Sequence, residues 1–582
     1  MLRTISALSA LALVAACGGQ GETSPETRTQ QAPVDSSSDI ANDNNLLMPL
    51  PIETTADITA EDFAIRVKTL ADDTFEGRAP GSDAGEASAE WIGAEMARLG
   101  LEPGFDDSYL QPVGMVELTL DESSSGLSVT GGSEPIEMRL GTDAVIWSKR
   151  QTEDTLSFED SELVFVGYGV IAPEYGWNDY EGLDVAGKTV VMLVNDPGFT
   201  NPEGDLFKGS AMTYYGRWTY KFEEAARQGA TGAIVIHETL PASYGWAVVA
   251  NSWSGPQADL VRNNAGEDRA MMEGWISADM AERLFAEADL DFTTQKRAAR
   301  ASDFKPVSMG DLTTTVTLNQ SMQTRESHNV VGVIPGETRP EEYVMYIGHW
   351  DHLGNKAIEG ETAPERDLIF NGAVDNATGI SAILEIAEAL AADPMDRSVI
   401  LVAVTLEESG LLGSAFYAEN PTVPLHQVVA GINIDAMLPI GQAKDMVVVG
   451  YGASELEDML KSILEGQDRV IVPDPSPQAG YFYRSDHISF AKKGVPVLYA
   501  DGGLDKRDGG TVAGQALAQL YTRDRYHKAA DEYDDNWNLL GTVEDVTALY
   551  QLGKQIANSS EWPQWYEGNE FKAIRDASRA GN

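Results

Sequence analysis

The sequence predicts an α/β protein whose main sheet is mixed, mostly parallel and sandwiched between helices, with a separate α+β unit inserted before most of it. Two observations carry this prediction. After Ser327, strands that are apolar throughout alternate with helices as far as Asp435, and such strands belong to sheets covered on both faces. Between about residues 141 and 310, short β-rich runs broken by glycine, proline and tyrosine surround a helix instead, which is typical of a compact unit of its own.

Length and composition fit a large folded protein with an acidic surface. The chain has 582 residues, of which 43% are hydrophobic, so two or three domains with cores of their own are expected. Its 91 acidic and 41 basic residues give a net charge of −50. This charge repels nucleic acid and anionic membrane surfaces, so neither is an expected partner.

The first 17 residues have the features of a targeting segment. Arg3 precedes an apolar run, Ile5 to Ala16, which closes on small residues before Cys17 and is too short to span a bilayer. The segment resembles a bacterial lipoprotein signal, which implies export to the cell envelope with membrane attachment only through a lipid on Cys17; the alternative is an ordinary signal peptide. Cys17 is the only cysteine, so no intrachain disulfide can form. Residues 18–50 are polar and predict a disordered tether.

Residues 51–140 are expected to form the N-terminal part of the main domain. Apolar residues recur with helical spacing from Phe63 to Leu70, and again from Ala87 to Leu99 before Gly100, which predicts two amphipathic helices. The glycine and proline residues of the loop between them surround Arg78. We expect this arginine to be a solvated loop charge rather than part of an active site.

In the predicted inserted unit, residues 141–310, a β-α-β pattern can be followed. The runs 162–170 and 188–196 are apolar and β-rich, a helix is expected over 221–228, and another apolar strand follows at 232–238. Residues 311–582 form the main part of the larger domain. Its expected strands and helices alternate in the order 343–349, 379–391, 398–405, 411–417 and 428–435.

Acid-base and metal-binding side chains stand where these strands end. His349, Glu407, Glu408 and Asp435 each come at or just after the end of an apolar run. In open α/β sheets, ligands gather at the carboxyl ends of the strands. The sequence therefore predicts one site that contains all four side chains.

Each residue also has a simpler interpretation when it is taken alone. Asp375, in a glycine-rich loop just before a helix, could be a helix-capping carboxylate, and His527 in its polar loop means little by itself. The adjacent acids Glu407 and Glu408 are harder to explain, because two carboxylates at a buried strand end are unfavourable unless a cation or proton compensates them. His349 is followed by Asp351, which could accept the second imidazole N–H and fix the tautomer.

Five segments together supply two imidazoles, three carboxylates and two further acids: GHWDHLG (348–354), NGAVDNATG (371–379), TLEESG (405–410), NIDAM (433–437) and YHKAADEYDD (526–535). This is the inventory needed to hold two zinc ions and to activate a water between them.

In this order, across residues 328–556, the segments resemble the co-catalytic zinc exopeptidase family that includes bacterial leucine aminopeptidases and glutamate carboxypeptidase II. The resemblance implies the zinc-peptidase fold and a ligand set for two Zn²⁺ ions. His349 and Asp435 would hold one ion, Glu408 and His527 the other, and Asp375 would bridge them. Glu407 would be the general base and Asp351 the partner of His349. The 141–310 region resembles the protease-associated domain that is often inserted in these peptidases.

A further stretch, YRSDHISFAKKGVPVLY (483–499), also resembles the family and implies a position beside the site. Ser485, Asp486 and His487 would shape the substrate pocket, and Tyr481 or Tyr483 would donate a hydrogen bond to the developing oxyanion. A purely structural role for His487 and for His352 is an equally good interpretation.

The expected function is that of a zinc-dependent exopeptidase, an aminopeptidase that releases N-terminal residues from peptides with a water bridged between two zinc ions. A carboxypeptidase or dipeptidase on the same scaffold is the main alternative. It would need an arginine for the substrate α-carboxylate, and Arg78, Arg217 and Arg484 are candidates. A non-catalytic binding homologue, such as the transferrin receptor, is a further alternative; it would have lost metal ligands, whereas all seven positions keep the expected residue types here. A glutaminyl cyclase on the related fold is also possible, but the full set of ligands for two metal ions favours hydrolysis.

Overall fold

The computed structural model describes residues 52–580, apart from 202–203, 205 and 357–366. The predicted signal segment with Cys17, and the predicted tether, lie outside the described residues, so lipid attachment and cellular location stay predictions. Within the described ranges, no helix has the length and apolar character needed to cross a membrane.

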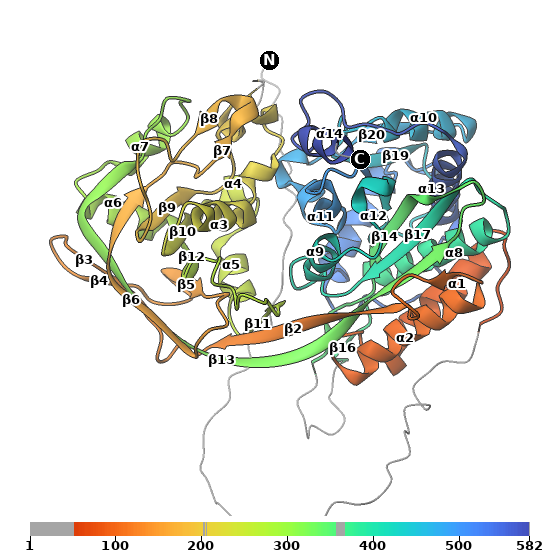
Figure 1. Ribbon diagram of the computed structural model, residues 1–582, viewed down its shortest axis with the longest axis horizontal. Helices are drawn as coiled ribbons and strands as arrows, with labels where there is room; N and C mark the ends of the chain where they lie inside the picture. The colour runs from red at the N-terminus through yellow and green to blue at the C-terminus, as the bar shows by residue number, and fades with distance from the viewer. Residues whose placement is uncertain (1–51, 202–203, 205, 357–366, 581–582) are drawn as a thin grey trace, which may run out of the picture.

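The described chain forms two units joined by long strands (Figure 1). In the main unit, four parallel neighbours form the centre of the sheet: β17 (Arg397–Val404), β14 (Arg339–His349), β18 (Val428–Asn433) and β21 (Val497–Gly502). On one side, β13 (Val307–Ile334) runs antiparallel to β17, and on the other β19 (Asp445–Val449), paired with β20 (Val470–Pro473), runs antiparallel to β21. The predicted mixed, mostly parallel sheet is confirmed.

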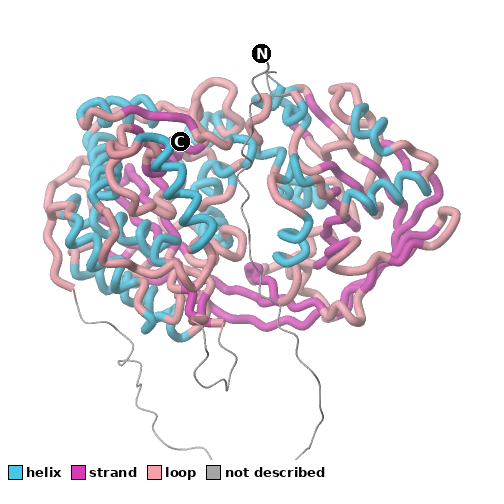
Figure 2. The backbone as a smooth tube through the Cα atoms, turned by 180° about the vertical axis from the view of Figure 1, so that it is seen from behind, coloured by secondary structure: helices cyan, strands magenta, loops and turns pink. Residues whose placement is uncertain are grey.

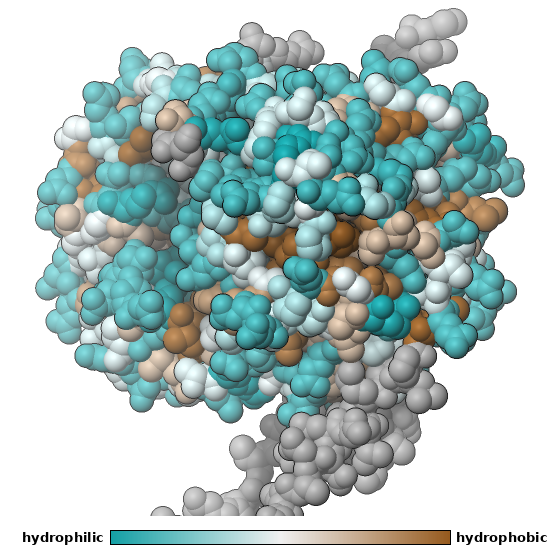
Figure 3. All heavy atoms as spheres, turned by 45° about the vertical axis from the view of Figure 1, so that its right-hand side comes forward, coloured by the Kyte–Doolittle hydropathy of each residue, from teal (hydrophilic) through white to brown (hydrophobic). Residues whose placement is uncertain are grey.

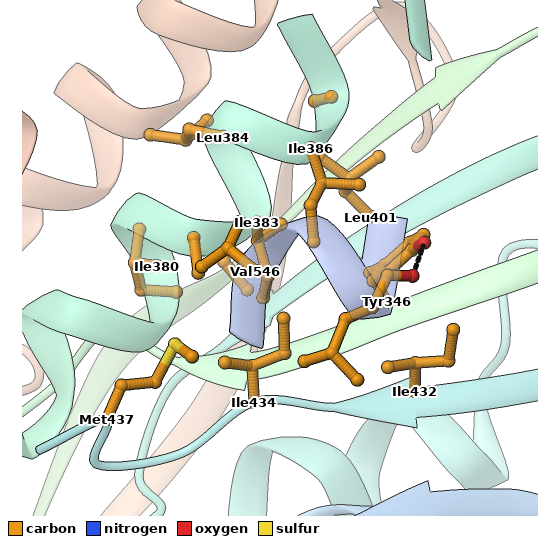
Figure 4. Close-up of a cluster of buried hydrophobic side chains, with 14 of the residues drawn as sticks. Tyr346, Ile380, Ile383, Leu384, Ile386, Leu401, Ile432, Ile434, Met437 and Val546 are labelled. Atoms are coloured by element: carbon orange, nitrogen blue, oxygen red, sulfur yellow. Dashed lines mark hydrogen bonds between the residues drawn. The ribbon is translucent and has the colours of Figure 1, made fainter. Parts of the chain in front are cut away.

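Helices cover both faces of this sheet, because successive side chains of a buried strand point to opposite faces. In β14, Tyr346 packs into the core beneath α1 (Ala60–Leu70), α2 (Asp83–Arg98), α8 (Thr378–Ala391) and α13 (Leu540–Asn558), while Met345 and Ile347 pack toward α9 (Leu412–Glu419) and α11 (His487–Ala491). Figure 4 shows Ile383 and Ile386 of α8 and Val546 of α13 in the same cluster of buried side chains as Tyr346. The Tyr346 hydroxyl donates to the Leu549 carbonyl at 2.9 Å. The remaining helices of the main unit are α10 (Leu456–Gly466), α12 (Gly510–Asp524) and α14 (Lys572–Ala580).

The second unit has its own sheet and its own core. Four of its strands are parallel neighbours: β6 (Thr155–Phe165), β9 (Thr189–Leu193), β10 (Gly232–Ile236) and β12 (Met272–Ile276). Around them lie β3 (Gly126–Thr130), β4 (Ile136–Glu137), β5 (Ala144–Trp147), α3 (Trp218–Arg227), α4 (Thr239–Ala242), α5 (Trp246–Ser252), α6 (Ala278–Glu287) and α7 (Phe292–Ala298). Of the remaining strands, β7 (Ile171–Ala172) pairs with β8 (Trp177–Asn178), and β11 (Pro256–Leu260) pairs with β2 (Leu110–Leu120). In the main unit, β1 (Glu102–Pro103) pairs with β13, and β15 (Gly354–Asn355) pairs with β16 (Ile369–Phe370).

One strand, β13, belongs to both sheets. Its residues 307–319 pair with β6, and 313–317 of these also pair with β3; residues 320–330 pair with β2 (Leu110–Leu120), and 330–334 pair with β17. Figures 1 and 2 show β2 and β13 running from one unit to the other. The second sheet therefore extends beyond the expected limits of 141 and 310, because it includes β3, β4 and the first half of β13.

The two units also meet across a cleft with a volume of about 700 Å³. The Met212 N–H donates to the Pro477 carbonyl at 3.1 Å, and Lys492 of the main unit lies 3.3 Å from Glu223 of the second unit. The cleft is lined by residues of both units, among them Trp147, Arg217, Glu407, Glu408 and His527. The second unit thus forms one wall of a cavity that reaches Glu407, Glu408 and His527 of the predicted site.

The chain carries a net charge of −50. In the face drawn in Figure 3, hydrophilic residues predominate around a smaller patch of apolar ones. Exposed apolar side chains of the described chain include Val512, Leu517 and Leu520 of α12. Single exposed apolar side chains are normal in soluble proteins, so these carry no functional argument by themselves.

Candidate metal centre

The five predicted segments meet at one edge of the main sheet. His349 is the last residue of β14, Glu407 and Glu408 follow β17, and Asp435 follows β18. Asp375 lies in the irregular turn Ala373–Ala377 before α8, and His527 lies just after α12. Parallel strands present their carboxyl ends at a common edge, which is why segments far apart in the sequence come together here.

The side chains form two groups that share Asp375. The Nε2 atom of His349 lies 3.3 Å from Asp375 Oδ1 and 3.3 Å from Asp435 Oδ1. The Nε2 atom of His527 lies 3.2 Å from Asp375 Oδ2 and 3.2 Å from Glu408 Oε2. Asp375 therefore presents one carboxylate oxygen to each imidazole, which is the arrangement expected of a carboxylate that bridges two metal ions.

Glu407 lies beside the first group. One ligand atom each from His349, Glu407 and Asp435 falls within 4.8 Å of the others. Burial, reinforced by the negative charge of Glu408, raises the pKa of the Glu407 carboxyl well above its ordinary value. The carboxylates of Glu407 and Asp435 hold the pKa of His349 well above the usual range, although burial opposes this shift. Proton-binding groups crowded in this way are typical of functional sites.

The backbone turns sharply beside three of these ligands. Leu406, Ala436 and His527 have φ angles of 58°, 52° and 54°, in the left-handed region that residues other than glycine seldom adopt. Such strained residues concentrate at functional sites, where surrounding structure holds them in place. The turn at Leu406 follows the end of β17 and comes just before Glu407 and Glu408. The chain therefore changes direction at the edge of the sheet, where both carboxylates lie.

All of these ligands lie within one segment of the sequence that matches a family model. Residues 329–551 match the model of peptidase family M28. That range, the M28 segment, contains all seven residues predicted as ligands, general base or histidine partner.

Curated relatives resemble only part of the chain. The probable glutamate carboxypeptidase LAMP1 of Arabidopsis thaliana is 27% identical over 293 residues, which are 44% of this chain and 38% of that protein. Leucine aminopeptidase 2 of Arthroderma otae is 25% identical over 43% of this chain and 48% of its own length. Transferrin receptor protein 1 of Gallus gallus is 24% identical over 49% of this chain and 34% of its own length. The chain thus spans about half or less of the length of these relatives.

Among solved structures, an aminopeptidase from Aneurinibacillus sp. strain AM-1 aligns with 87% of this chain and 95% of its own length. The sequence identity is 16% and the TM-score is 0.45.

In the M28 segment, Asp351 contacts His349 differently from the sequence prediction. The His349 Nδ1 atom lies 3.1 Å from the backbone carbonyl of Asp351 and 3.8 Å from its carboxylate. That carboxylate instead accepts the N–H of Glu407 at 3.1 Å, and burial raises its pKa to about 7. Asp351 therefore positions His349 through its main chain and Glu407 through its side chain.

His352 of the M28 segment is in contact with the site. Its Nδ1 atom lies 2.6 Å from Glu408 Oε1, so the two oxygens of Glu408 contact two imidazoles, those of His352 and His527. Ligand atoms of His352, Asp375 and Glu408 fall within 4.8 Å of one another. Its Nε2 is buried and lacks a hydrogen-bond partner among the described residues. The structure favours a role in the site over the purely structural interpretation.

Two further side chains hold the predicted ligands in position. The Ser485 hydroxyl donates to Asp435 Oδ2 at 2.7 Å and accepts from the Asn433 side chain at 2.8 Å. Asp531, which is fully buried, accepts the N–H of Asp375 at 3.1 Å. Asp531 belongs to one of the five segments but received no predicted role, because an acid in a loop with several acids carries no distinguishing signal.

The other residues predicted near the substrate lie in different environments. The hydroxyl of Tyr483 donates to Glu570 at 2.6 Å, so this hydroxyl does not contact the ligands, and Tyr481 is 38% exposed.

Asp486 and His487 are both buried. Burial raises the pKa of Asp486 to about 7. His487 packs between Phe482 and Tyr499, with ring centroids 4.6 Å and 5.1 Å away, and burial lowers its pKa to about 3. The surroundings of His487 fit the structural interpretation. Tyr526, which received no predicted role, stacks on His527 with ring centroids 4.0 Å apart and also lines the cleft.

Arg78 is not the solvated loop charge that the sequence indicated. Its side chain is buried, and it donates to four backbone carbonyls: Leu70 at 2.7 Å, Trp350 at 2.7 Å, Asn371 at 2.6 Å and Gly372 at 2.9 Å. Burial lowers its pKa to about 10, so it stays charged near neutral pH. Trp350 directly follows His349, and Gly372 directly precedes the turn that contains Asp375. Through these contacts Arg78 holds in place the two loops that carry His349 and Asp375.

We expect Arg78→Met to lower the free energy of unfolding by about 3–5 kcal/mol, because four buried carbonyls would lose their donor. Urea denaturation would measure this loss. Arg139→Met is the matched control, because Arg139 is exposed and pairs with its neighbour Asp143 at 2.7 Å; its urea midpoint should be that of the parent chain. Equal midpoints for the two variants would contradict the role given to Arg78.

Proposed function

We propose that this chain is a zinc-dependent exopeptidase, and specifically an aminopeptidase that removes N-terminal residues from peptides at a centre of two zinc ions. The observation that carries the proposal is the position of Asp375, whose two oxygens lie 3.3 Å from His349 and 3.2 Å from His527. The match of residues 329–551 to peptidase family M28 supports the same reaction class.

The donor atoms fit zinc. Each group offers one imidazole nitrogen and carboxylate oxygens, a set that zinc binds in catalytic sites. His349, Asp375 and Asp435 would hold one ion, and Asp375, Glu408 and His527 would hold the other. Two buried atoms beside these ligands, His352 Nε2 and Asp351 Oδ2, have no hydrogen-bond partner among the described residues. When bound, zinc would polarise the scissile carbonyl and lower the pKa of a coordinated water toward neutrality.

Glu407 is positioned to move the proton. Its N–H is held by the Asp351 carboxylate at 3.1 Å, and its side chain lines the cleft beside Glu408 and His527. Burial raises its pKa, whereas cations at the neighbouring ligands would lower it again. These two effects act on the pKa of the Glu407 carboxyl in opposite directions. As the general base, Glu407 would take a proton from the attacking water and return it to the leaving amine.

The carboxypeptidase or dipeptidase alternative has one structural observation in its favour. Two of the three candidate arginines, Arg217 and Arg484, line the cleft. The third, Arg78, already donates its hydrogen bonds to backbone carbonyls. The free N-terminus of the substrate and its carboxylate must therefore be tested separately.

The direct test compares leucyl-p-nitroanilide with its N-acetylated form, using protein stripped by a chelator and then reloaded with zinc. We expect zinc to restore hydrolysis of the free form and acetylation to abolish it, because a blocked amine cannot bind as a neutral ligand. No hydrolysis after zinc reloading would contradict the proposed function. Cleavage of N-acetyl peptides that requires a free C-terminal carboxylate would establish the carboxypeptidase alternative instead.

A further inference from the structure

The cleft between the two units is bounded on one side by a ribbon of strands. The described chain passes between the units along β2 and along β13, which pair with each other over residues 110–120 and 320–330. The strand β11 widens this ribbon, because it pairs with β2. Leu118, Ala258 and Gln320 of these three strands line the cleft. In Figures 1 and 2 the ribbon runs from one unit to the other along the lower edge of the described chain.

Away from the ribbon, side chains of the two units contact each other directly. Figure 1 shows α3 and α11 on facing sides of the two units, above the ribbon. Lys492, just after α11, lies 3.3 Å from Glu223 of α3, and its ammonium group lies 4.4 Å from the ring centre of Tyr214. These three residues line the cleft. A second ion pair joins Lys208 of the second unit to Glu570 of the main unit at 2.9 Å. We call the two ion pairs the inter-unit bridge.

The ion pairs of the inter-unit bridge are weak, because water reaches them. The side chains of Lys492 and Glu223 are 33% and 27% exposed, and that of Lys208 is 43% exposed. Pairs of this kind contribute little to stability and weaken as the ionic strength rises. Relative motion is the usual behaviour of two units of one chain unless a large apolar interface joins them. The ribbon therefore serves as a hinge on which the units separate once the bridge is broken.

We infer that the inter-unit bridge selects substrates by length. With the bridge intact, the cleft takes peptides of a few residues; a longer peptide binds only after the bridge breaks and the units separate on the ribbon. The inference rests on the proposed function for the cleavage step, because the cleft also reaches Glu407, Glu408 and His527 of the candidate metal centre.

The dimensions of the cleft support this selection. Its volume of about 700 Å³ is within the range of small-ligand sites, which suits a peptide of few residues. An extended chain advances about 3.3 Å with each residue, so every added residue carries the tail of the peptide farther from the metal centre. The tail of a long peptide therefore reaches the walls of the cleft, where the bridge and the ribbon obstruct it.

Two peptides with the same N-terminus measure the selection. One is the amide of Leu-Ala-Ala, and the other is the amide of a peptide of about twelve residues that begins with Leu-Ala-Ala and has no charged side chain. We define the length preference as kcat/KM for the short peptide divided by kcat/KM for the long one. We expect a preference of about 5-fold or more, the size that two partly exposed ion pairs can supply. It should come from KM, because binding to a minor open state weakens the apparent affinity by the fraction that is open.

Lys492→Glu should reduce the length preference to near 1, because it places two carboxylates together at the bridge, and Lys208→Glu should act in the same direction. Combining Lys492→Glu with Glu223→Lys restores opposite charges and should recover most of the preference, which a mere loss of structure would not allow. Lys493→Glu is the matched control, because Lys493 pairs with Glu419 within the main unit at 2.6 Å; it should keep the full preference. Circular dichroism establishes that each variant is folded.

Salt and scattering test the opening of the cleft independently. Raising the ionic strength from about 0.05 M to about 0.5 M should lower the length preference of the parent chain and leave that of Lys492→Glu unchanged, since salt screens the bridge. Small-angle X-ray scattering needs no turnover: the radius of gyration should be larger for Lys492→Glu than for the parent chain, and the charge-swapped variant should match the parent chain.

A parent chain without a length preference would overturn the inference. So would a folded Lys492→Glu protein with the preference and the radius of gyration of the parent chain. Failure to hydrolyse either peptide would count against the proposed function alone, because the scattering comparison would still test whether the bridge holds the units together.

Discussion

Glu407→Gln is expected to lower kcat by about 100-fold or more while the fold and the bound zinc are retained. Glutamine has nearly the same shape as glutamate but cannot accept a proton from the attacking water. The Glu407 main chain would stay in place, because its N–H is held by Asp351 at 3.1 Å. None of the contacts within 3.3 Å that join the two imidazoles to Asp375, Asp435 and Glu408 involves the Glu407 side chain.

Steady-state kinetics with leucyl-p-nitroanilide, together with zinc content by elemental analysis, would check this prediction. Glu419→Gln is the matched control, since Glu419 is an exposed glutamate that pairs with Lys493 at 2.6 Å; its kcat should equal that of the parent chain. If Glu407→Gln turned over substrate at a near-normal rate, another group would have to be the base. Loss of zinc in this variant would instead assign Glu407 to the ligands.

The main sheet could be predicted from the sequence because its strands are uniformly apolar. The run expected at 398–405 is β17 (Arg397–Val404), and the run at 428–435 contains β18 (Val428–Asn433). Strands buried on both faces show no alternation, and helices between them show a period of 3.6, so the two are easily distinguished. The predicted helix at 379–391 likewise corresponds to α8 (Thr378–Ala391).

The 28 residues of β13, Val307–Ile334, cross the predicted limit between the inserted unit, which was expected to end at about residue 310, and the main part of the larger domain. Along Val307–Asn319, small and polar residues dominate, and nothing local distinguishes pairing with β6 from pairing with strands of the main sheet. Which sheet a strand joins depends on partners far away in the sequence. This is why the limits of the second unit could not be predicted closely from composition.

The candidate site was predictable to the extent that its residues stand at strand ends. The positions of His349 and Asp435 follow from that rule, whereas Arg78, Arg217 and Arg484 do not. The partners of Arg78 are backbone carbonyls, which carry no sequence signal. Arg217 and Arg484 line the cleft from different units, and which residues line a cleft between two units depends on the fold. His352 was ambiguous for a similar reason, since its contact with Glu408 depends on where β17 ends.

Asp375→Ala is expected to have a larger effect than the loss of any other single ligand, because Asp375 is the one carboxylate of the described residues that contacts the imidazoles of both His349 and His527. Without it, Asp435 would be the one carboxylate of the described residues near the Nε2 atom of His349, at 3.3 Å, and Glu408 the one near the Nε2 atom of His527, at 3.2 Å. Catalytic zinc sites use three protein ligands, so both groups would fall short. We expect zinc to be lost and activity to fall by more than about 99%, since the metal supplies the polarisation of the carbonyl.

Elemental analysis after gel filtration would measure the zinc content, and leucyl-p-nitroanilide hydrolysis would measure the activity. The comparison is Asp396→Ala, which removes a surface carboxylate that lies 3.0 Å from Arg339 and should leave both quantities unchanged. Because Asp375 is buried beside two imidazoles, its loss also removes the negative charge that compensates them, so circular dichroism must establish that the variant is folded. A folded Asp375→Ala protein that retained two zinc ions per chain would rule out the bridging role, and with it the arrangement of ligands on which the proposed function rests.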